Sequence, residues 1–169
     1  MVNMIKVYDN VDVAGNFDLY GFLLYQNAYI YGEKDKSEDD APTGMVFDIK
    51  DPTLLEWFCN AAVQHHKELK NLQLARAYVN LFQPHERPHW HDDGDFWTCL
   101  FYVTPEHDIE ENGETQFLGN GEIRGILPKK NRLIVFDGVL QHRATPFRNH
   151  PRLTVALKYF KENESNTNK

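Results

Sequence analysis

The chain has 169 residues, of which 41% are hydrophobic and 25% are charged, with a formal net charge of -7. This length predicts one domain with its own core, and the composition excludes wholesale disorder. The acidic balance argues against a protein that tracks nucleic-acid phosphates, and two cysteines, Cys59 and Cys99, cannot form a disulfide scaffold. Because the sequence shows no secretory signal and no apolar run that could span a membrane, we expect a soluble cytoplasmic protein.

Residues 1–72 are expected to support the core of the domain. Within them, residues 4–13 predict a short strand. Residues 17–31 are apolar and fit either a helix or a strand, so the pattern leaves both open. Residues 32–42 are rich in charged and small polar residues and predict a mobile surface loop.

The clearest helix of the chain follows this loop. Asp51 can cap its first turn, Pro52 suits the first helical position, and apolar residues then recur at helical spacing. We expect the helix to end near Asn71. Cys59 falls on it and is expected to be a buried small hydrophobic residue.

From residue 73 onward the pattern changes to short runs rich in β-branched and aromatic residues, which turn residues interrupt. The predicted strands are residues 74–82, 96–104, 115–118, 123–127, 133–136 and 153–160. Many short strands at this spacing predict an antiparallel sandwich or barrel with one or two helices outside it. Residues 73–160 are therefore the expected core, with Cys99 buried in a strand, and the polar residues 161–169 predict a frayed tail.

The segment from Pro88 to Asp95 is the richest in metal-ligand types. Because residues two apart on extended backbone point to the same side, His91 and Asp93 can offer an imidazole and a carboxylate to one point. His142, just after an apolar strand, is the best candidate for a third ligand. Two histidines and one carboxylate leave three positions open on a metal, as in non-haem Fe(II) oxygenases.

A bare His-x-Asp pattern is common by chance, so the argument depends on a second cluster. Arg152 lies ten residues after His142 and begins a predicted strand, on which Thr154 shares its face. A charged arginine in an apolar strand is costly unless an anion meets it, and a guanidinium can bind a carboxylate through two hydrogen bonds. The alternative is that Arg152 pairs with one of the protein's own acids. Together with the three candidate ligands, Arg152 favours an anionic cosubstrate.

These motifs resemble the prolyl 4-hydroxylase-like branch of the Fe(II)/2-oxoglutarate-dependent dioxygenases. The resemblance covers residues 74–160 and includes, in order, the His-x-Asp pair, Gly-Glu-Thr-x-Phe at residues 113–117, residues 131–138, His142 and Arg152. It implies a mainly β (α+β) fold with a double-stranded β-helix, or jelly-roll, core. It also implies an enzyme that uses Fe(II), 2-oxoglutarate and O₂ and that ascorbate stimulates.

The resemblance assigns a role to each matching residue. It implies that iron binds His91, Asp93 and His142, and that Arg152 binds the distal carboxylate of 2-oxoglutarate. Thr154 matches a frequent helper position. Tyr102 matches a tyrosine that also reaches this carboxylate in relatives, although it can equally be a core aromatic residue. The implied reaction couples decarboxylation of 2-oxoglutarate, to succinate and CO₂, with hydroxylation of a substrate C–H bond.

Two departures from the family pattern concern the substrate. Many relatives have a tyrosine where this chain has Phe82, and a glycine where it has His85, so the loop that leads to the site is expected to differ in shape. Prolyl hydroxylation therefore does not follow from the resemblance alone, and the expected substrate is a protein side chain or a small molecule. Trp97, Arg143 and Arg148 are candidates for the mouth of the site, where the two arginines either contact a substrate or belong to a solvated loop, and Trp90 is expected to pack outside it.

Two other functions fit parts of the sequence. A cupin-type metal protein would use His89, His91, Asp93 and Asp95 on one face of a continuing strand, but it has no general need for Arg152. A non-catalytic jelly-roll binding module would leave the histidines structural, and the absence of any bound metal would distinguish it.

Overall fold

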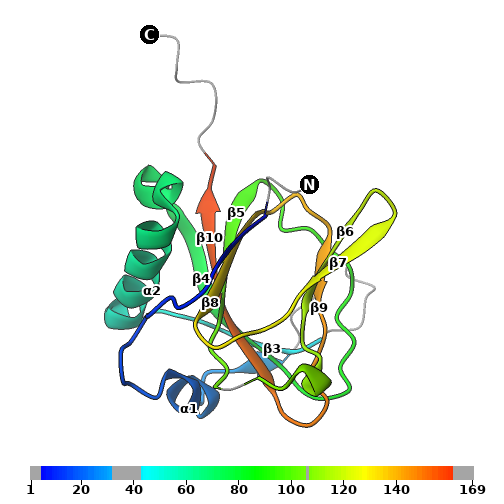
Figure 1. Cartoon of the computed structure of the whole chain (residues 1–169). Coiled ribbons are helices and arrows are strands. Elements are labelled where there is room, and N and C mark those ends of the chain that lie inside the picture. Colours follow the sequence, from blue (N-terminus) through cyan, green and yellow to red (C-terminus); the bar gives the residue numbers. More distant parts are fainter. Residues whose placement is uncertain (1–4, 32–42, 106, 162–169) are drawn as a thin grey trace.

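The structure, a computed structural model, describes residues 5–31, 43–105 and 107–161 (Figure 1). The predicted loop at residues 32–42 and the predicted tail from residue 162 onward lie outside the described residues. The elements in chain order are β1 (Ile5–Tyr8), α1 (Leu19–Leu24), β2 (Ile30–Tyr31), β3 (Met45–Asp48), α2 (Pro52–His65), the 3₁₀ helix η2 (Lys67–Asn71), β4 (Leu74–Phe82), β5 (Phe96–Tyr102), the 3₁₀ helix η3 (Ile109–Glu111), β6 (Thr115–Gly119), β7 (Glu122–Ile126), β8 (Arg132–Asp137), β9 (His142–Ala144) and β10 (Arg152–Phe160).

Two antiparallel sheets form the core. The larger sheet has the strand order β1-β8-β5-β10-β4-β3-β2, and the smaller has the order β7-β6-β9. Figure 1 shows the two sheets facing each other, with α2 on the outer side of the larger sheet. The mainly β jelly-roll predicted for the chain is therefore confirmed.

Strand β10 has buried side chains on both faces of the larger sheet. Leu153, Val155 and Leu157 are fully buried in the cluster that includes the helix residues Phe58 and Ala62. The residues between them point to the opposite face, toward the smaller sheet, because side chains alternate along a strand. Residues 152–159 are therefore all buried, although four of them do not face the helices.

Helix α2 begins where the sequence predicted and ends earlier. The Asp51 carboxylate accepts a hydrogen bond from the backbone N–H of Leu54 at 2.9 Å, which caps the first turn. The α-helix ends at His65, and the predicted extension to Asn71 is a separate 3₁₀ helix. Cys59 is half-buried, so its predicted burial was wrong, whereas Cys99 is buried in β5 as expected.

The apolar stretch at residues 17–31 contains both alternatives that its pattern left open. Helix α1 is capped by Asp18, whose carboxylate accepts from the Gly21 N–H at 3.0 Å, and the edge strand β2 follows it. Strands β3 and β9 were not predicted, because each is short and owes its strand geometry to pairing with β4 and β6. Among the described residues, no helix is long and apolar enough to cross a membrane.

Candidate active site

Backbone pairing brings two of the candidate ligands together. His142 lies on β9, and His91 lies in the connection between β4 and β5. The N–H of His91 donates to the carbonyl of His142 at 3.0 Å, and the reverse bond is 2.8 Å long, so the two residues form an antiparallel bridge. Directly opposed residues carry their side chains on the same face, and the two imidazole rings lie 4.4 Å apart between centroids.

Both imidazoles are oriented for metal binding through Nε2. The Nδ1 atom of His91 lies 3.1 Å from the carbonyl oxygen of His89, and that of His142 lies 2.8 Å from that of Leu140. A carbonyl only accepts, so each Nδ1 carries the hydrogen and each Nε2 presents its lone pair. Burial lowers the pKa of His142 to about 4, although the nearby Asp93 opposes this shift. His142 is therefore neutral near pH 7.

Asp93 completes the group. Its Oδ1 lies 3.9 Å from Nε2 of His91, and its Oδ2 lies 3.5 Å from Nε2 of His142. Burial alone would raise the pKa of Asp93, but the charge of Lys158 and the hydrogen bonds from Lys158 and Thr98 lower it to about 2. Asp93 is thus an ionised carboxylate at all pH values near neutrality.

A tight backbone contact holds Asp93 in place. Its N–H donates to the carbonyl of Gly138 at 2.7 Å, and the N–H of Gly138 donates to the carbonyl of Phe96 at the same distance. A Cβ atom at residue 138 would lie 2.7 Å from the carbonyl oxygen of Gly94 and 2.8 Å from that of Phe96. Only glycine fits this position without moving the backbone that carries Asp93.

The three predicted ligands thus meet at one point. One ligand atom from each of His91, Asp93 and His142 lies within 4.8 Å of the other two, a spacing that a metal ion can bridge. Two imidazole nitrogens and one carboxylate oxygen form the donor set of non-haem Fe(II) oxygenases. Asp95 is not part of this group, because its side chain is 78% exposed and pairs with Lys161 at 2.9 Å. The four-residue cupin arrangement is therefore not assembled.

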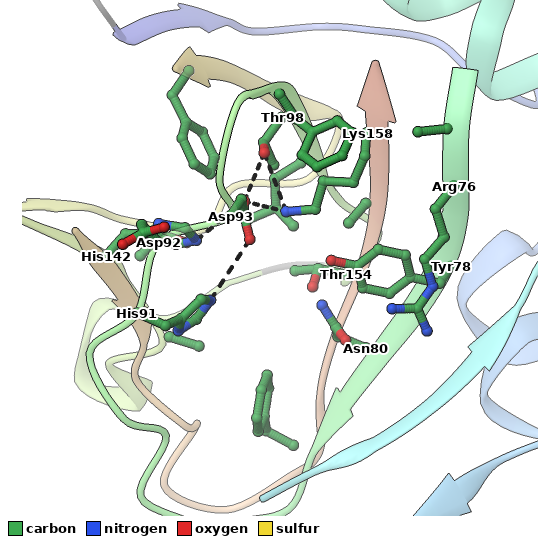
Figure 2. A pocket seen from close by; sticks show the side chains of 18 of the residues that line it. Arg76, Tyr78, Asn80, His91, Asp92, Asp93, Thr98, His142, Thr154 and Lys158 are labelled. Atoms are coloured by element: carbon green, nitrogen blue, oxygen red, sulfur yellow. Dashed lines mark hydrogen bonds and ion pairs between the residues drawn. The ribbon is translucent and has the colours of Figure 1, made fainter. Parts of the chain in front are cut away.

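A cavity of about 340 Å³ adjoins the three ligands, and Arg152 and Thr154 line it as well. In Figure 2, His91, Asp93 and His142 lie on one side of this cavity, and Tyr78, Asn80 and Thr154 lie across from them. Its volume is in the range of small-molecule sites.

Arg152 enters the cavity from the first position of β10 and is 1% exposed. Its Nε donates to the carbonyl of Gly113 at 2.9 Å, and its Nη2 donates to Oγ1 of Thr115 at 2.9 Å. Within the described residues, Arg152 forms no ion pair with an acid. Burial lowers its pKa, and Glu114 opposes this shift only as a minor electrostatic attraction, so a direct internal carboxylate partner is not supported. The guanidinium has five N–H donors, and those left over can bind an anion.

Thr154 and Tyr102 both lie near Arg152, but only Thr154 lines the cavity. The hydroxyl of Thr154 is buried and has no hydrogen-bond partner among the described residues, so it is available to a ligand in the cavity. Tyr102 does not line the cavity; its hydroxyl lies 2.6 Å from Oγ1 of Thr115 and donates to the carbonyl of Ile126 at 3.2 Å. Tyr102 therefore supports Arg152 through Thr115 and also directly, because the Arg152 Cζ lies 5.4 Å from the centroid of the Tyr102 ring.

The residues at the two departures from the family pattern are also placed. Phe82 lines the cavity and brings no hydroxyl. His85 has a φ of 75°, the left-handed conformation that glycine favours, and the expected difference in loop shape from relatives stays a prediction.

Several residues expected near the mouth lie elsewhere. The Arg143 guanidinium stacks on Trp90, with 4.5 Å from Cζ to the ring centroid, and donates to Gln116 at 2.9 Å. Neither residue lines the cavity, nor do Trp97 and Arg148. Trp90 thus packs outside the site as expected, the candidate Trp97 lies away from the cavity, and the lining of the cavity does not support a substrate contact for Arg143 or Arg148.

Sequence reasoning missed two cavity residues, Thr98 and Lys158, which contact Asp93 (Figure 2). A signal for Lys158 was present, because it lies six residues after Arg152 and so shares its face of the strand. A lysine near the end of a predicted strand is usually exposed, which hid this signal.

Comparisons with known proteins agree with this geometry. Residues 72–160 match the family model described as the 2OG-Fe(II) oxygenase superfamily. No curated protein sequence matches the chain.

Solved structures share the fold. A prolyl hydroxylase from Trichoplax adhaerens, in complex with a hypoxia inducible factor oxygen degradation domain peptide fragment, has a TM-score of 0.73 at 14% identity, over 94% of this chain and 84% of that one. The viral collagen prolyl hydroxylase of Paramecium Bursaria Chlorella virus-1, in its 2-oxoglutarate complex, has a TM-score of 0.67 at 15% identity, over 94% and 97%. HygX from Streptomyces hygroscopicus, with nickel, 2-oxoglutarate and hygromycin B bound, has a TM-score of 0.66 at 11% identity, over 92% and 82%.

Proposed function

The chain belongs to the 2OG-Fe(II) oxygenase superfamily, and we propose that it is a hydroxylase whose iron binds His91, Asp93 and His142. Family membership implies Fe(II), 2-oxoglutarate and O₂ as the reaction's requirements. The donor set fits Fe(II), because two neutral imidazoles and one ionised carboxylate leave positions for further ligands on the metal. When bound, the iron supplies the oxidative chemistry that couples 2-oxoglutarate decarboxylation to attack on a C–H bond.

The protein's own residues bind and orient the reactants. The carbonyls of His89 and Leu140 fix the tautomers of His91 and His142, so both lone pairs face Asp93. Arg152, at the start of β10, binds the distal carboxylate of 2-oxoglutarate, and the unpaired hydroxyl of Thr154 adds a donor to the same ligand.

The observation that carries this proposal is the state of Arg152. A guanidinium that is 1% exposed, bonded only to neutral groups and facing the same cavity as the three ligands is stable when a carboxylate enters that cavity. A purely structural arginine would instead meet one of the protein's own acids. The non-catalytic binding module has no need for this combination.

The size of the site and the ligands of proteins with the same fold support two candidate substrate classes. We propose a protein side chain, with peptidyl proline as the first candidate, or a small molecule. The Trichoplax structure contains a peptide, and the HygX structure contains hygromycin B.

The test is turnover of 2-oxoglutarate by the purified protein supplied with Fe(II), ascorbate and O₂. We expect slow succinate formation even without a substrate, stimulation by ascorbate, and loss of turnover in His142→Ala. Absence of both succinate and 2-oxoglutarate binding in the wild type would refute the proposal. A screen of proline-containing peptides and small molecules for faster succinate release then identifies the substrate class.

A further inference from the structure

Lys158 is a buried lysine in the candidate active site, and the proposed binding of metal and cosubstrate gives it no role. It lies on β10, lines the same cavity as Arg152, and is 9% exposed. A lysine is almost never buried unless it is paired. The partners of Lys158 therefore indicate what it does.

The register between β10 and β5 places the Lys158 side chain next to Asp93. In the antiparallel pairing of β10 with β5, Lys158 lies directly opposite Thr98. The ammonium donates to Oγ1 of Thr98 at 3.1 Å and forms an ion pair with Oδ2 of Asp93, and the Thr98 hydroxyl donates to the same Oδ2 at 2.6 Å. Figure 2 shows these three side chains converging at one end of the cavity.

The two oxygens of Asp93 are thereby made unequal. Oδ2 accepts from both Thr98 and Lys158, which use its two lone-pair positions. Oδ1 accepts no hydrogen bond from the described residues and lies 3.9 Å from Nε2 of His91. Both oxygens lie near an imidazole nitrogen, since Oδ2 is 3.5 Å from Nε2 of His142, but only Oδ2 also accepts hydrogen bonds from the protein.

We propose that Lys158, together with Thr98, is a positioning residue that makes Asp93 bind the metal through Oδ1 alone. This inference rests on the proposed function, because the number of open metal positions matters only for a cosubstrate and O₂. A carboxylate bound through one oxygen leaves three of six positions, two for 2-oxoglutarate and one for O₂. A carboxylate bound through both oxygens would remove one of them.

A counter-ion role for Lys158 makes a different prediction. If Lys158 only neutralised Asp93, its removal would take a positive charge away from the site of a divalent cation and strengthen metal binding, but nitric oxide uptake would not change and Thr98→Val, which removes no charge, would bind Mn(II) like the wild type. If Lys158 reserves Oδ2, its removal also frees a second oxygen for the metal, so that metal binding strengthens and nitric oxide uptake falls. General damage to the site would instead weaken metal binding.

The test uses Lys158→Met, Thr98→Val and the double variant, with Lys161→Met as the matched control. Lys161 also joins carboxylates near this site, those of Asp95 and Asp137, but it does not contact Asp93. Mn(II) affinity is measured from the electron paramagnetic resonance signal of free Mn(II). Nitric oxide, a probe for the O₂ position, is then added anaerobically to the protein with Fe(II) and 2-oxoglutarate, and its uptake is followed by the same method.

We expect Lys158→Met and the double variant to bind Mn(II) about tenfold more tightly or better than the wild type. We expect the double variant to lose most nitric oxide uptake, while the wild type and Lys161→Met retain it. Thr98→Val, which frees one lone pair and keeps the shape, should change both readouts in the same direction by less. If Lys158→Met does not fold, Thr98→Val alone carries the test.

Two results would overturn the inference: unchanged or weaker Mn(II) binding in the variants, or wild-type nitric oxide uptake in the double variant. Failure of the proposed function is distinguishable from both. It would appear as a wild-type protein that binds Mn(II) but not 2-oxoglutarate, and the Mn(II) comparison would still test Lys158.

Discussion

Replacement of Arg152 separates cosubstrate binding from metal binding. In Arg152→Met the side chain keeps a similar length and loses all donors, including those not used by Gly113 and Thr115. Removal of one partner from a buried charge pair costs about 2–5 kcal/mol, which corresponds to about 30-fold to several thousand-fold weaker binding. We expect 2-oxoglutarate affinity to fall within this range. Arg152→Lys retains the charge without the planar fork and should fall between the wild type and Arg152→Met.

The assay is calorimetric titration of 2-oxoglutarate into the Mn(II)-loaded protein, with Mn(II) affinity measured separately. Arg152→Met should keep nearly wild-type Mn(II) affinity, whereas His142→Ala should lose it. Equal loss of metal in both variants, or unchanged 2-oxoglutarate affinity in Arg152→Met, would refute the assigned division of labour.

Thr154→Val removes a single hydrogen-bond donor from the cavity and should affect 2-oxoglutarate binding less than the Arg152 variants do. The Thr154 hydroxyl has no partner among the described residues, so replacement by an isosteric methyl group should leave folding intact. We expect 2-oxoglutarate affinity to fall by about threefold to tenfold, which corresponds to the net loss of one hydrogen bond. Thermal unfolding checks that stability is unchanged.

Two further predictions concern the support of the site and the acid limit of the fold. Gly138→Ala should displace the backbone at Asp93, lower the free energy of unfolding by about 1–3 kcal/mol and weaken Mn(II) binding. The control is Gly125→Ala, whose added Cβ would meet the flexible Glu114 side chain, and it should change neither the free energy of unfolding nor Mn(II) affinity. Wild-type Mn(II) affinity in Gly138→Ala would contradict the argument that only glycine fits at residue 138. Asp9→Asn should cost about 1 kcal/mol or less at pH 7, because the Asp9 carboxylate is a third exposed and pairs with Arg132 at 2.7 Å. The hydrogen bond from Arg132 lowers the pKa of Asp9 to about 2 from the usual 3.8, so this contribution is present above pH 4 and is lost as pH falls toward 2. Denaturant unfolding at a series of pH values should show the wild type and Asp9→Asn converging in acid, and a gap that stays constant would rule out the assigned pairing.

The sequence by itself determined the features that local spacing controls. The nine-residue run that predicted a strand at residues 74–82 is β4 with the same bounds, and Asp51 caps α2 as its position indicated. The spacing of two between His91 and Asp93 placed both side chains on one side. The even spacing of Arg152 and Thr154 placed both in one cavity. Each of these depends on backbone periodicity, which a short window of sequence contains.

Tertiary structure decided every contact that depends on strand register. β9 has three residues and no apolar alternation, so its existence depends on pairing with β6 and on the bridge to His91. Lys158 meets Thr98 only because β10 and β5 pair in one particular register across sixty positions of the chain. A shift of one residue in that register would carry Lys158 to the other face of the sheet. The sequence thus identified the three candidate metal ligands, and the fold determined how one of them, Asp93, is held.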